Sequence, residues 1–127
     1  MIPIHRNRNH WTLILLDPIQ HEIDFYDPKH KDGNEILEKV LEFIKELHQF
    51  YSLTFDRKQW KLKSHADIPY QTDGDSCGIL TILAMECLSL KKPMDFTMNS
   101  VVEIRRKIKV VLAAEALLDP YIYDIPK

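Results

Sequence analysis

The chain has 127 residues, the size of one ordinary domain, and its 45% hydrophobic content is enough for a packed core. Its formal net charge of −2 excludes a general electrostatic attraction to nucleic acid or to an anionic membrane surface. No apolar run is long enough for a transmembrane helix, and residues 1–10 are too polar for a signal peptide. We therefore predict one domain, residues 1–127, with no nucleic-acid partner and no membrane partner.

The first predicted elements form a β-hairpin. Residues 10–16 are apolar and rich in β-formers, which is typical of a buried strand. Residues 17–21 have the chemistry of a turn. Residues 22–27 alternate, with Ile23 and Phe25 on one face, so they predict the returning strand of the hairpin.

Helices dominate the rest of the chain. Residues 33–51 carry apolar side chains at helical spacing and predict an amphipathic helix, and residues 59–63 alternate as a short strand. Residues 77–90 are apolar almost all round, which predicts a buried helix. A third helix is predicted over residues 98–118, with an apolar stripe of Val101, Ile104, Ile108, Val111 and Leu118.

The order of these elements predicts an α+β domain with an antiparallel sheet flanked by helices. Basic residues cluster only at 105–109, and on a helix such a run usually forms a solvated face. We expect Trp60 in the core.

The two cysteines lie ten residues apart on the same predicted helix. Ten residues of helix span about 15 Å, which is too far for a disulfide between them. No CxxC pair is present and the six histidines lack zinc-ligand spacing, so we expect no metal and no cofactor. Free thiols favour a reducing compartment, the nucleus or the cytoplasm.

The stretch YQTDGDSCGI, residues 70–79, places a thiol where a polar turn becomes an apolar helix. Asp75 or Ser76 is a plausible N-cap, which puts Cys77 in the first helical turn. The backbone N–H groups and the helix dipole stabilise negative charge at that point. Since only the thiolate is a strong nucleophile, this position favours a reactive cysteine.

The alternative for either cysteine is burial as a small hydrophobe. We expect this for Cys87, which lies inside the apolar helix. At Cys77 the polar lead-in and the flanking Gly74 and Gly78 favour the nucleophile instead. Small residues let another chain approach closely, so Gly74 is a candidate substrate-binding residue.

A nucleophilic cysteine needs an imidazole, and the imidazole needs an orienting carboxylate. Opposed residues of an antiparallel hairpin have a constant index sum, and a turn centred near residue 19 predicts a sum of 37 or 38. His10 and Asp27 fit this sum, so we predict that they face each other at about 5 Å. A surface histidine and a turn aspartate before Pro28 are the alternative. The histidines without a comparable partner, expected in solvent, are His5, His21, His30, His48 and His65.

Gln71 stands six residues before Cys77, just past Pro69. Its side-chain amide and the backbone N–H of Cys77 are candidates for two converging donors of an oxyanion hole. The alternative is a loop glutamine that makes a turn hydrogen bond, and the spacing does not decide between the two.

These residues resemble the signature of the ubiquitin-like-protein-specific cysteine proteases, the SUMO and NEDD8 protease family to which the adenovirus protease is related. The matching motifs are HW at 10–11, YD at 26–27 and QTDGDSCG at 71–78, in the chain order His, Asp, Gln, Cys. IPIH at 2–5 and QWKLK at 59–63 also resemble strands of this family. The resemblance covers most of the chain.

The resemblance implies catalytic roles for four residues. His10 is the expected general base, Asp27 its orienter, Cys77 the nucleophile and Gln71 the oxyanion donor. It also implies that Trp11 walls a narrow tunnel for the Gly-Gly tail of a ubiquitin-like protein.

The expected function is that of a cysteine protease or isopeptidase that cleaves after the C-terminal glycine of a SUMO- or NEDD8-type modifier, with that modifier and its conjugates as partners. An acyltransferase on the same scaffold and an inactive module that binds ubiquitin-like proteins are the alternatives. The chain departs from the family at Ser76, where an aspartate is common. Family domains also carry a segment before the IPIH strand, so we expect the N-terminal lobe to be missing from residues 1–127.

Overall fold

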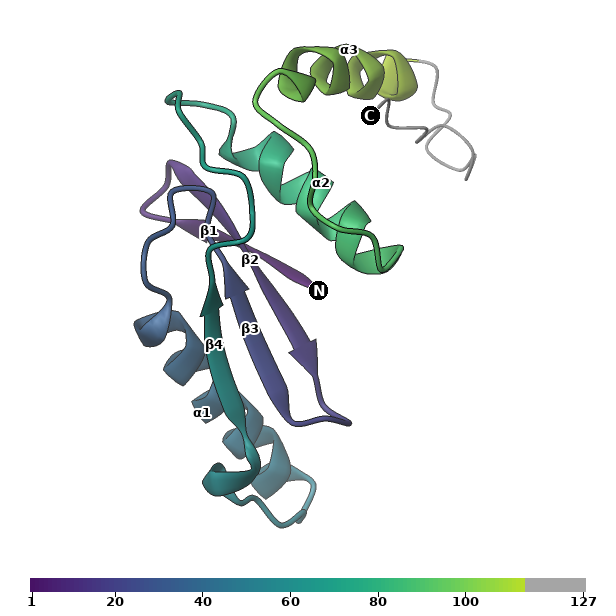
Figure 1. The fold of residues 1–127 in the computed structure, drawn as a ribbon. Coiled ribbons are helices and arrows are strands. Elements are labelled where there is room, and N and C mark those ends of the chain that lie inside the picture. The colour runs from purple at the N-terminus through teal and green to yellow at the C-terminus, as the bar shows by residue number, and fades with distance from the viewer. Residues whose placement is uncertain (114–127) are drawn as a thin grey trace.

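The computed structural model describes residues 1–113 and places helices on both faces of a four-stranded sheet (Figure 1). The elements are β1 Ile2–Arg6, β2 His10–Asp17, β3 Glu22–Tyr26, α1 Asn34–Phe50, β4 Lys61–His65, α2 Cys77–Ser89 and α3 Ser100–Ala113. A 3₁₀ turn at Arg57–Gln59 precedes β4. The prediction of an α+β domain is therefore confirmed.

The sheet is mixed, whereas the sequence predicts an antiparallel one. Its strand order is β1-β2-β3-β4, in which the first two pairings are antiparallel and β4 runs parallel to β3. The connection explains the difference, because α1 lies between β3 and β4 in the chain and carries it back along the sheet before β4 begins. The predicted antiparallel direction is right for β1 to β3 and wrong for β4.

Two hydrophobic cores lie on opposite faces of the sheet, and β2 contributes to both. Leu13 packs in the core formed with α2 and α3, and its neighbour Ile14 packs in the core formed with α1. Both side chains are fully buried because successive residues of a strand point to opposite faces. This packing on both faces explains why residues 13–16 are continuously apolar rather than alternating.

Helix α1 lies close against β3. Gly33, the residue before α1, has no side chain, and a Cβ there would overlap the ring of Phe25. Phe25 and Ile23 are both fully buried, as the alternation in residues 22–27 predicts. Trp60 is also buried in this core, as expected.

The predicted helices are found close to their expected bounds. Helix α2 ends one residue before the predicted end at 90. Helix α3 begins at Ser100, with Val101, Ile104 and Val111 buried, and the predicted residues 114–118, including Leu118, lie outside the described part of the chain. No helix within residues 1–113 combines the length and apolarity needed to span a bilayer.

The hairpin register differs from the prediction, which gave an index sum of 37 or 38 for paired residues. Asp17 pairs with Glu22 and Leu13 with Tyr26, so the index sum of the pairs is 39. The turn is thus centred after residue 19, because it consists of residues 18–21. His10 and Asp27 are therefore not directly opposed.

Candidate active site

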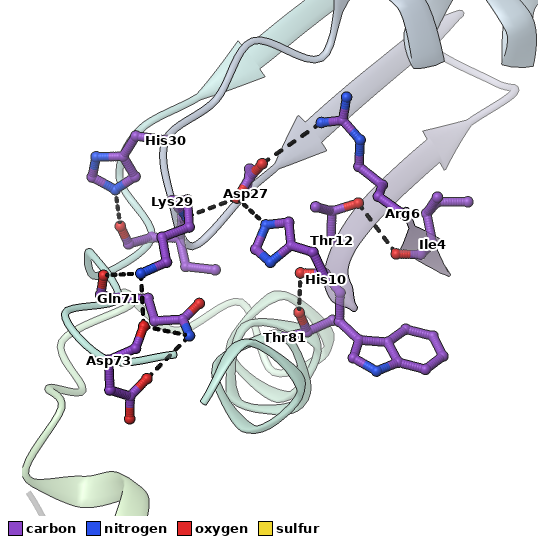
Figure 2. A network of polar contacts seen from close by, with 12 residues as sticks. Ile4, Arg6, His10, Thr12, Asp27, Lys29, His30, Gln71, Asp73 and Thr81 are labelled. Carbon is purple, nitrogen blue, oxygen red and sulfur yellow. Dashed lines mark hydrogen bonds and ion pairs between the residues drawn. The ribbon is translucent and has the colours of Figure 1, made fainter. Parts of the chain in front are cut away.

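His10 and Asp27 are nevertheless in contact. His10 opens β2, Asp27 follows the end of β3, and the imidazole Nε2 lies 2.7 Å from the Asp27 Oδ1 (Figure 2). Residues that lie diagonally across two paired strands are still within reach of each other's long side chains. This explains why His10 and Asp27 are in contact although they are not directly opposed. Asp27 is fully buried, and the His10 side chain is 15% exposed.

The Asp27 carboxylate is held from two further sides. Its Oδ1 accepts a 2.7 Å hydrogen bond from the backbone N–H of Lys29. Its Oδ2 lies 3.7 Å from Arg6 Nη1, an ion pair too long for a hydrogen bond. Because an ionised carboxylate only accepts, His10 donates from Nε2, and the neutral imidazole then keeps Nδ1 as its acceptor.

Cys77 is the first residue of α2, as predicted. Its side chain is buried but lines a pocket of about 400 Å³. As the opening residue of a helix, its backbone N–H has no partner within the helix. The thiol therefore combines the field of a helix N-terminus with an open pocket.

The two predicted substrate-binding residues, Trp11 and Gly74, line this same pocket. The Trp11 indole is 39% exposed, and its Cδ1 would lie 3.5 Å from a Cβ placed on Gly78. His5 stacks on the indole with ring centroids 4.5 Å apart, so the indole has both His5 and Gly78 as neighbours. A Cβ on Gly74 would meet no atom within 4 Å, so the chain leaves space beside this residue.

Gln71 is buried, and its amide is bound within its own loop. The side-chain Nε2 lies 3.1 Å from the Asp73 carbonyl oxygen and 3.0 Å from Asp73 Oδ1, while Oε1 has no hydrogen-bond partner. The loop hydrogen bond that the sequence offered as an alternative is thus present. The convergence of Gln71 with the Cys77 backbone N–H stays a prediction.

Asp73 organises the start of α2, and the sequence analysis did not identify it. The N-cap is Ser76, one of the two predicted residues, but its side chain makes no capping bond. Instead Asp73 accepts hydrogen bonds from the Ser76 hydroxyl and, at 3.1 Å, from the Ser76 backbone N–H. The Ser76 hydroxyl bond, assisted by the Gln71 amide and the backbone N–H groups of Ser76 and Asp75, holds the pKa of Asp73 well below its usual range. An aspartate three residues before the N-cap, whose side chain binds nearby backbone N–H groups, is a signal that sequence can carry.

Two cations also reach this loop. Lys29 Nζ donates to the carbonyl oxygens of Gln71 and Asp73 at 3.0 and 2.7 Å. Arg105 Nη2 donates to the Asp75 carbonyl oxygen at 2.9 Å, and the residue lines the pocket. The predicted solvated face at 105–109 therefore holds for Arg105 only in part, since its side chain is 44% exposed but bound to the loop. Neither contact is predictable from spacing, because each joins segments far apart in the chain.

One histidine expected in solvent has a carboxylate partner. His65 Nε2 lies 2.6 Å from Asp24 Oδ1 and Nδ1 lies 3.5 Å from Asp67, while the ring stacks on Tyr26 with centroids 4.5 Å apart. The prediction that His65 lacks a comparable partner is wrong. The reason is the parallel pairing of β4 with β3, which sets His65 opposite Tyr26.

Within residues 1–113, no group of three or more His, Cys, Asp or Glu side chains is arranged to hold a metal ion.

Comparison with known protein families matches residues 1–119 to the Ulp1 protease family, C-terminal catalytic domain. This chain belongs to that family. The resemblance carried by the His, Asp, Gln and Cys motifs is thus confirmed at the level of the family. The family assignment and the motif agree on almost the same part of the chain.

Relatives of known name are sentrin-specific proteases. The chain is 27% identical over 122 residues to sentrin-specific protease 2 of Pongo abelii, a match that covers 93% of the chain and 20% of the relative. Sentrin-specific protease 5 of Mus musculus is 25% identical over 119 residues, covering 94% of the chain and 16% of the relative. The chain therefore spans a fifth or less of the length of these curated relatives.

Solved structures of Ulp1 have the same fold. The SUMO protease Ulp1 with its catalytic cysteine oxidised to a sulfonic acid is 26% identical, with a TM-score of 0.73 over 91% of this chain and 52% of that one. The C-terminal Ulp1 protease domain in complex with Smt3, the yeast ortholog of SUMO, is 27% identical, with a TM-score of 0.72 over the same shares. The chain thus spans about half of each solved Ulp1 chain.

Proposed function

We propose that this chain is a cysteine protease and isopeptidase that cleaves after the C-terminal glycine of a SUMO-type modifier. The observation that carries the proposal is the 2.7 Å contact between His10 Nε2 and Asp27 Oδ1 in a member of the Ulp1 family. Cys77, at the start of α2 and beside the pocket, supports it as the nucleophile. The relatives named as SUMO and sentrin-specific proteases support the substrate class.

The proposed reaction uses His10 Nδ1 as the proton carrier. His10 takes the proton of the Cys77 thiol, and the thiolate attacks the carbonyl carbon of the modifier's last glycine. The C–N bond then breaks, His10 protonates the leaving amine, and a thioester to Cys77 remains. His10 next takes a proton from water, and the hydroxide attacks the thioester carbonyl carbon. The C–S bond breaks, the modifier leaves with a C-terminal carboxyl group, and His10 returns its proton to the Cys77 thiolate. Asp27 orients the imidazole and stabilises its charged form.

The oxyanion of each tetrahedral intermediate needs donors. We assign them to the backbone N–H of Cys77 and the side-chain amide of Gln71. In this structure the Gln71 Nε2 contacts two acceptors of Asp73, the carbonyl oxygen at 3.1 Å and Oδ1 at 3.0 Å. An amide carries two N–H hydrogens, so the proposed role requires that one of these contacts is exchanged for the oxyanion.

The pocket suits an extended tail of glycines. Trp11 lines the pocket with a flat indole that neighbours His5 and Gly78, and the space at Gly74 is open. An extended chain without side chains fits such a slot, while residues with a Cβ meet the indole. SUMO- and NEDD8-type modifiers are the proposed substrates, and the named relatives favour the SUMO type.

A panel of modifiers tests the proposal. SUMO, NEDD8 and ubiquitin, each with a fluorophore in amide linkage at the C-terminal glycine, are incubated with the chain and with Cys77→Ser as the matched control. We expect fluorophore release from SUMO by the wild type and none by Cys77→Ser. Binding of SUMO without release from any modifier would support the inactive binding module instead. Transfer of the modifier to an added amine faster than release into water would support the acyltransferase.

The domain, the localisation and the absence of a cofactor are also proposed. We propose that residues 1–127 form a ubiquitin-like protease catalytic domain, which spans about half of each solved Ulp1 chain that it matches. The modifier panel above tests this, because a catalytic domain should release the fluorophore by itself. We also propose that the protein acts in the nucleus or cytoplasm, which imaging of a fluorescent fusion tests. The absence of a cofactor is tested by assay after extensive chelation.

A further inference from the structure

Three carbonyl groups of the Gln71 loop, residues 71–76, are bound by two cations from outside the loop. Lys29 Nζ binds the carbonyl oxygens of Gln71 and Asp73, and Arg105 binds that of Asp75. The bound carbonyls therefore alternate along the loop. Figure 2 shows the Lys29 ammonium between the Asp27 turn and the loop.

Binding of a carbonyl fixes the orientation of its whole peptide plane, since the C=O and the following N–H are coplanar. The Gln71 loop contains no helix or strand, so no ladder of hydrogen bonds orients its planes. In the segment that leads to Cys77, hydrogen bonds from Lys29 and Arg105 therefore orient the peptide planes. Without such hydrogen bonds the peptide groups near the thiol can rotate, and the N–H donors for an oxyanion then have no fixed position.

Lys29 differs from Arg105 because it also contacts the catalytic carboxylate. Its backbone N–H donates to Asp27 Oδ1 at 2.7 Å, while its side chain holds the loop. Gln71 itself donates its backbone N–H to the Pro28 carbonyl oxygen at 2.7 Å. Lys29 thus joins Asp27, the proposed orienter of His10, to the loop that carries Gln71, the proposed oxyanion donor.

The ammonium of Lys29 is well matched to this position. It has three donors, and two of them bind carbonyl oxygens. The Nζ also lies 5.7 Å from the centre of the Tyr70 ring, within the range of a cation–π contact. The side chain is therefore held at its charged end, although the residue is only partly buried.

We propose that Lys29 is a positioning residue that holds the Gln71 loop against the Asp27 turn, so that the oxyanion donor keeps a fixed place relative to His10. The role rests on the proposed function. Lys29 acts through Gln71, so its contribution to catalysis cannot exceed that of the Gln71 amide. The charge and the donors matter more than the bulk of the side chain.

The test measures hydrolysis of the SUMO–fluorophore amide by Lys29→Met, Lys29→Arg and Gln71→Ala. Gln71→Ala should lower kcat by about 10²-fold, the usual effect of losing one oxyanion donor. Lys29→Met should lower kcat about tenfold with KM changed less than about twofold, and Lys29→Arg should recover to within about threefold of the wild type. In the Gln71→Ala background, Lys29→Met should add less than about twofold, because the two residues act as one unit.

Alkylation of Cys77 by iodoacetamide separates positioning from a general loss of structure. This reaction needs the thiolate but forms no oxyanion, so Lys29→Met should leave its rate within about twofold. The matched control is Lys31→Met, at an exposed lysine two residues away, which should change neither reaction. An equal loss of kcat with and without Gln71, or a parallel loss of alkylation, would overturn the proposal. If Lys29→Met does not fold, Lys29→Gln takes its place with the same expectations.

Amide hydrogen exchange keeps this inference separate from the proposed function. Loop amides of residues 71–76 should exchange at least about tenfold faster in Lys29→Met than in the wild type or Lys29→Arg, while β2 amides stay unchanged. If the wild type releases no fluorophore from any modifier, the proposed function fails, and the exchange result alone decides whether Lys29 holds the loop. Unchanged loop exchange would overturn the proposal whether or not the protein is active.

Discussion

Residues 1–113 contain two imidazole–carboxylate pairs of almost equal length, and we propose a catalytic role for only one of them. His10 and Asp27 are 2.7 Å apart, and His65 and Asp24 are 2.6 Å apart. In both pairs the contact is made through Nε2. Distance alone therefore does not distinguish them.

The difference lies in what surrounds each pair. His65 has a second carboxylate, Asp67, 3.5 Å from its Nδ1, so both ring nitrogens face negative charge. Within residues 1–113, His10 has a carboxylate at Nε2 only. A general base for a thiol needs a ring nitrogen that faces no carboxylate, and of these two histidines only His10 has such a nitrogen within the described residues.

The two carboxylates also differ in burial. Asp27 is fully buried, while the Asp24 side chain is 20% exposed. Tyr26, stacked on His65, is part of the same surroundings, and burial together with Asp24 and Asp67 raises the pKa of Tyr26 to about 12. The second pair thus resembles a structural link between β3 and β4, while the first lies at the strand ends nearest the start of α2 (Figure 2).

Replacement of the two histidines should give the largest contrast. We expect His10→Ala to lower kcat for the SUMO–fluorophore amide by about 10³-fold or more, because the proton carrier is lost. His65→Ala should leave kcat within about threefold, because His65 takes no part in the proposed reaction. Steady-state hydrolysis measures both. Comparable losses of kcat in the two variants would contradict the proposal that His10, and not His65, carries the proton.

The carboxylates should show a smaller contrast of the same kind. Asp27→Asn should lower kcat about 10²-fold or more, because an amide no longer selects the tautomer with the proton on Nε2. Asp24→Asn should change kcat by less than about threefold. Both variants keep the shape of the side chain, and thermal melting controls for folding. An active Asp27→Asn would remove the orienter from the proposed mechanism.

The thiols should differ in reactivity by a smaller factor. Iodoacetamide should label Cys77 at least about tenfold faster than Cys87 near neutral pH, because Cys77 opens a helix and lines the pocket. Burial, followed by the nearby Glu86 and Asp95, raises the pKa of Cys87. Mass spectrometry of the labelled peptides measures the ratio.

The histidine variants provide the control for this labelling experiment. His10→Ala should slow the labelling of Cys77, and His65→Ala should not. Equal labelling of both thiols in every variant would show that Cys77 is not activated.

The smallest expected effect concerns acid stability at the start of α2. The lowered pKa of Asp73 contributes stability that is fully present above the unfolded pKa, about 3.9, and is lost as the pH falls toward the folded value. The difference in urea midpoint between the wild type and Asp73→Asn should therefore be larger near pH 7 than below about pH 4. Asp75→Asn, at an exposed carboxylate, is the control. A difference that does not change with pH would contradict the cause given for the lowered pKa.

Local patterns predicted most elements of the fold and the candidate site. Apolar runs and helical spacing located β2, α1 and α2, and the polar lead-in placed Cys77 in the first turn of its helix. The hairpin brought His10 and Asp27 together, although the turn was predicted about half a position too early and the register was wrong. The contact survived this error because a diagonal pair is still within reach of an imidazole.

Contacts between distant segments were not predictable from the same patterns. The parallel direction of β4, and with it the contact of His65 with Asp24, depends on the path of α1 across the sheet. The binding of Lys29 to a loop more than forty residues away depends on how the Asp27 turn meets the approach to α2. Lys29 lies in a turn, where no helical or strand periodicity indicates which way its side chain points.

The sequence by itself determined the residue types of the site, their order and the element on which each one lies. Side-chain periodicity and helix-start chemistry are local, so they are written in neighbouring residues. Only the tertiary structure decided which histidines meet a carboxylate, how deeply each carboxylate is buried, and which cations hold the Gln71 loop. Those choices depend on strand direction and loop packing, which are set by the balance of burial over the whole sheet rather than by any short stretch of the chain.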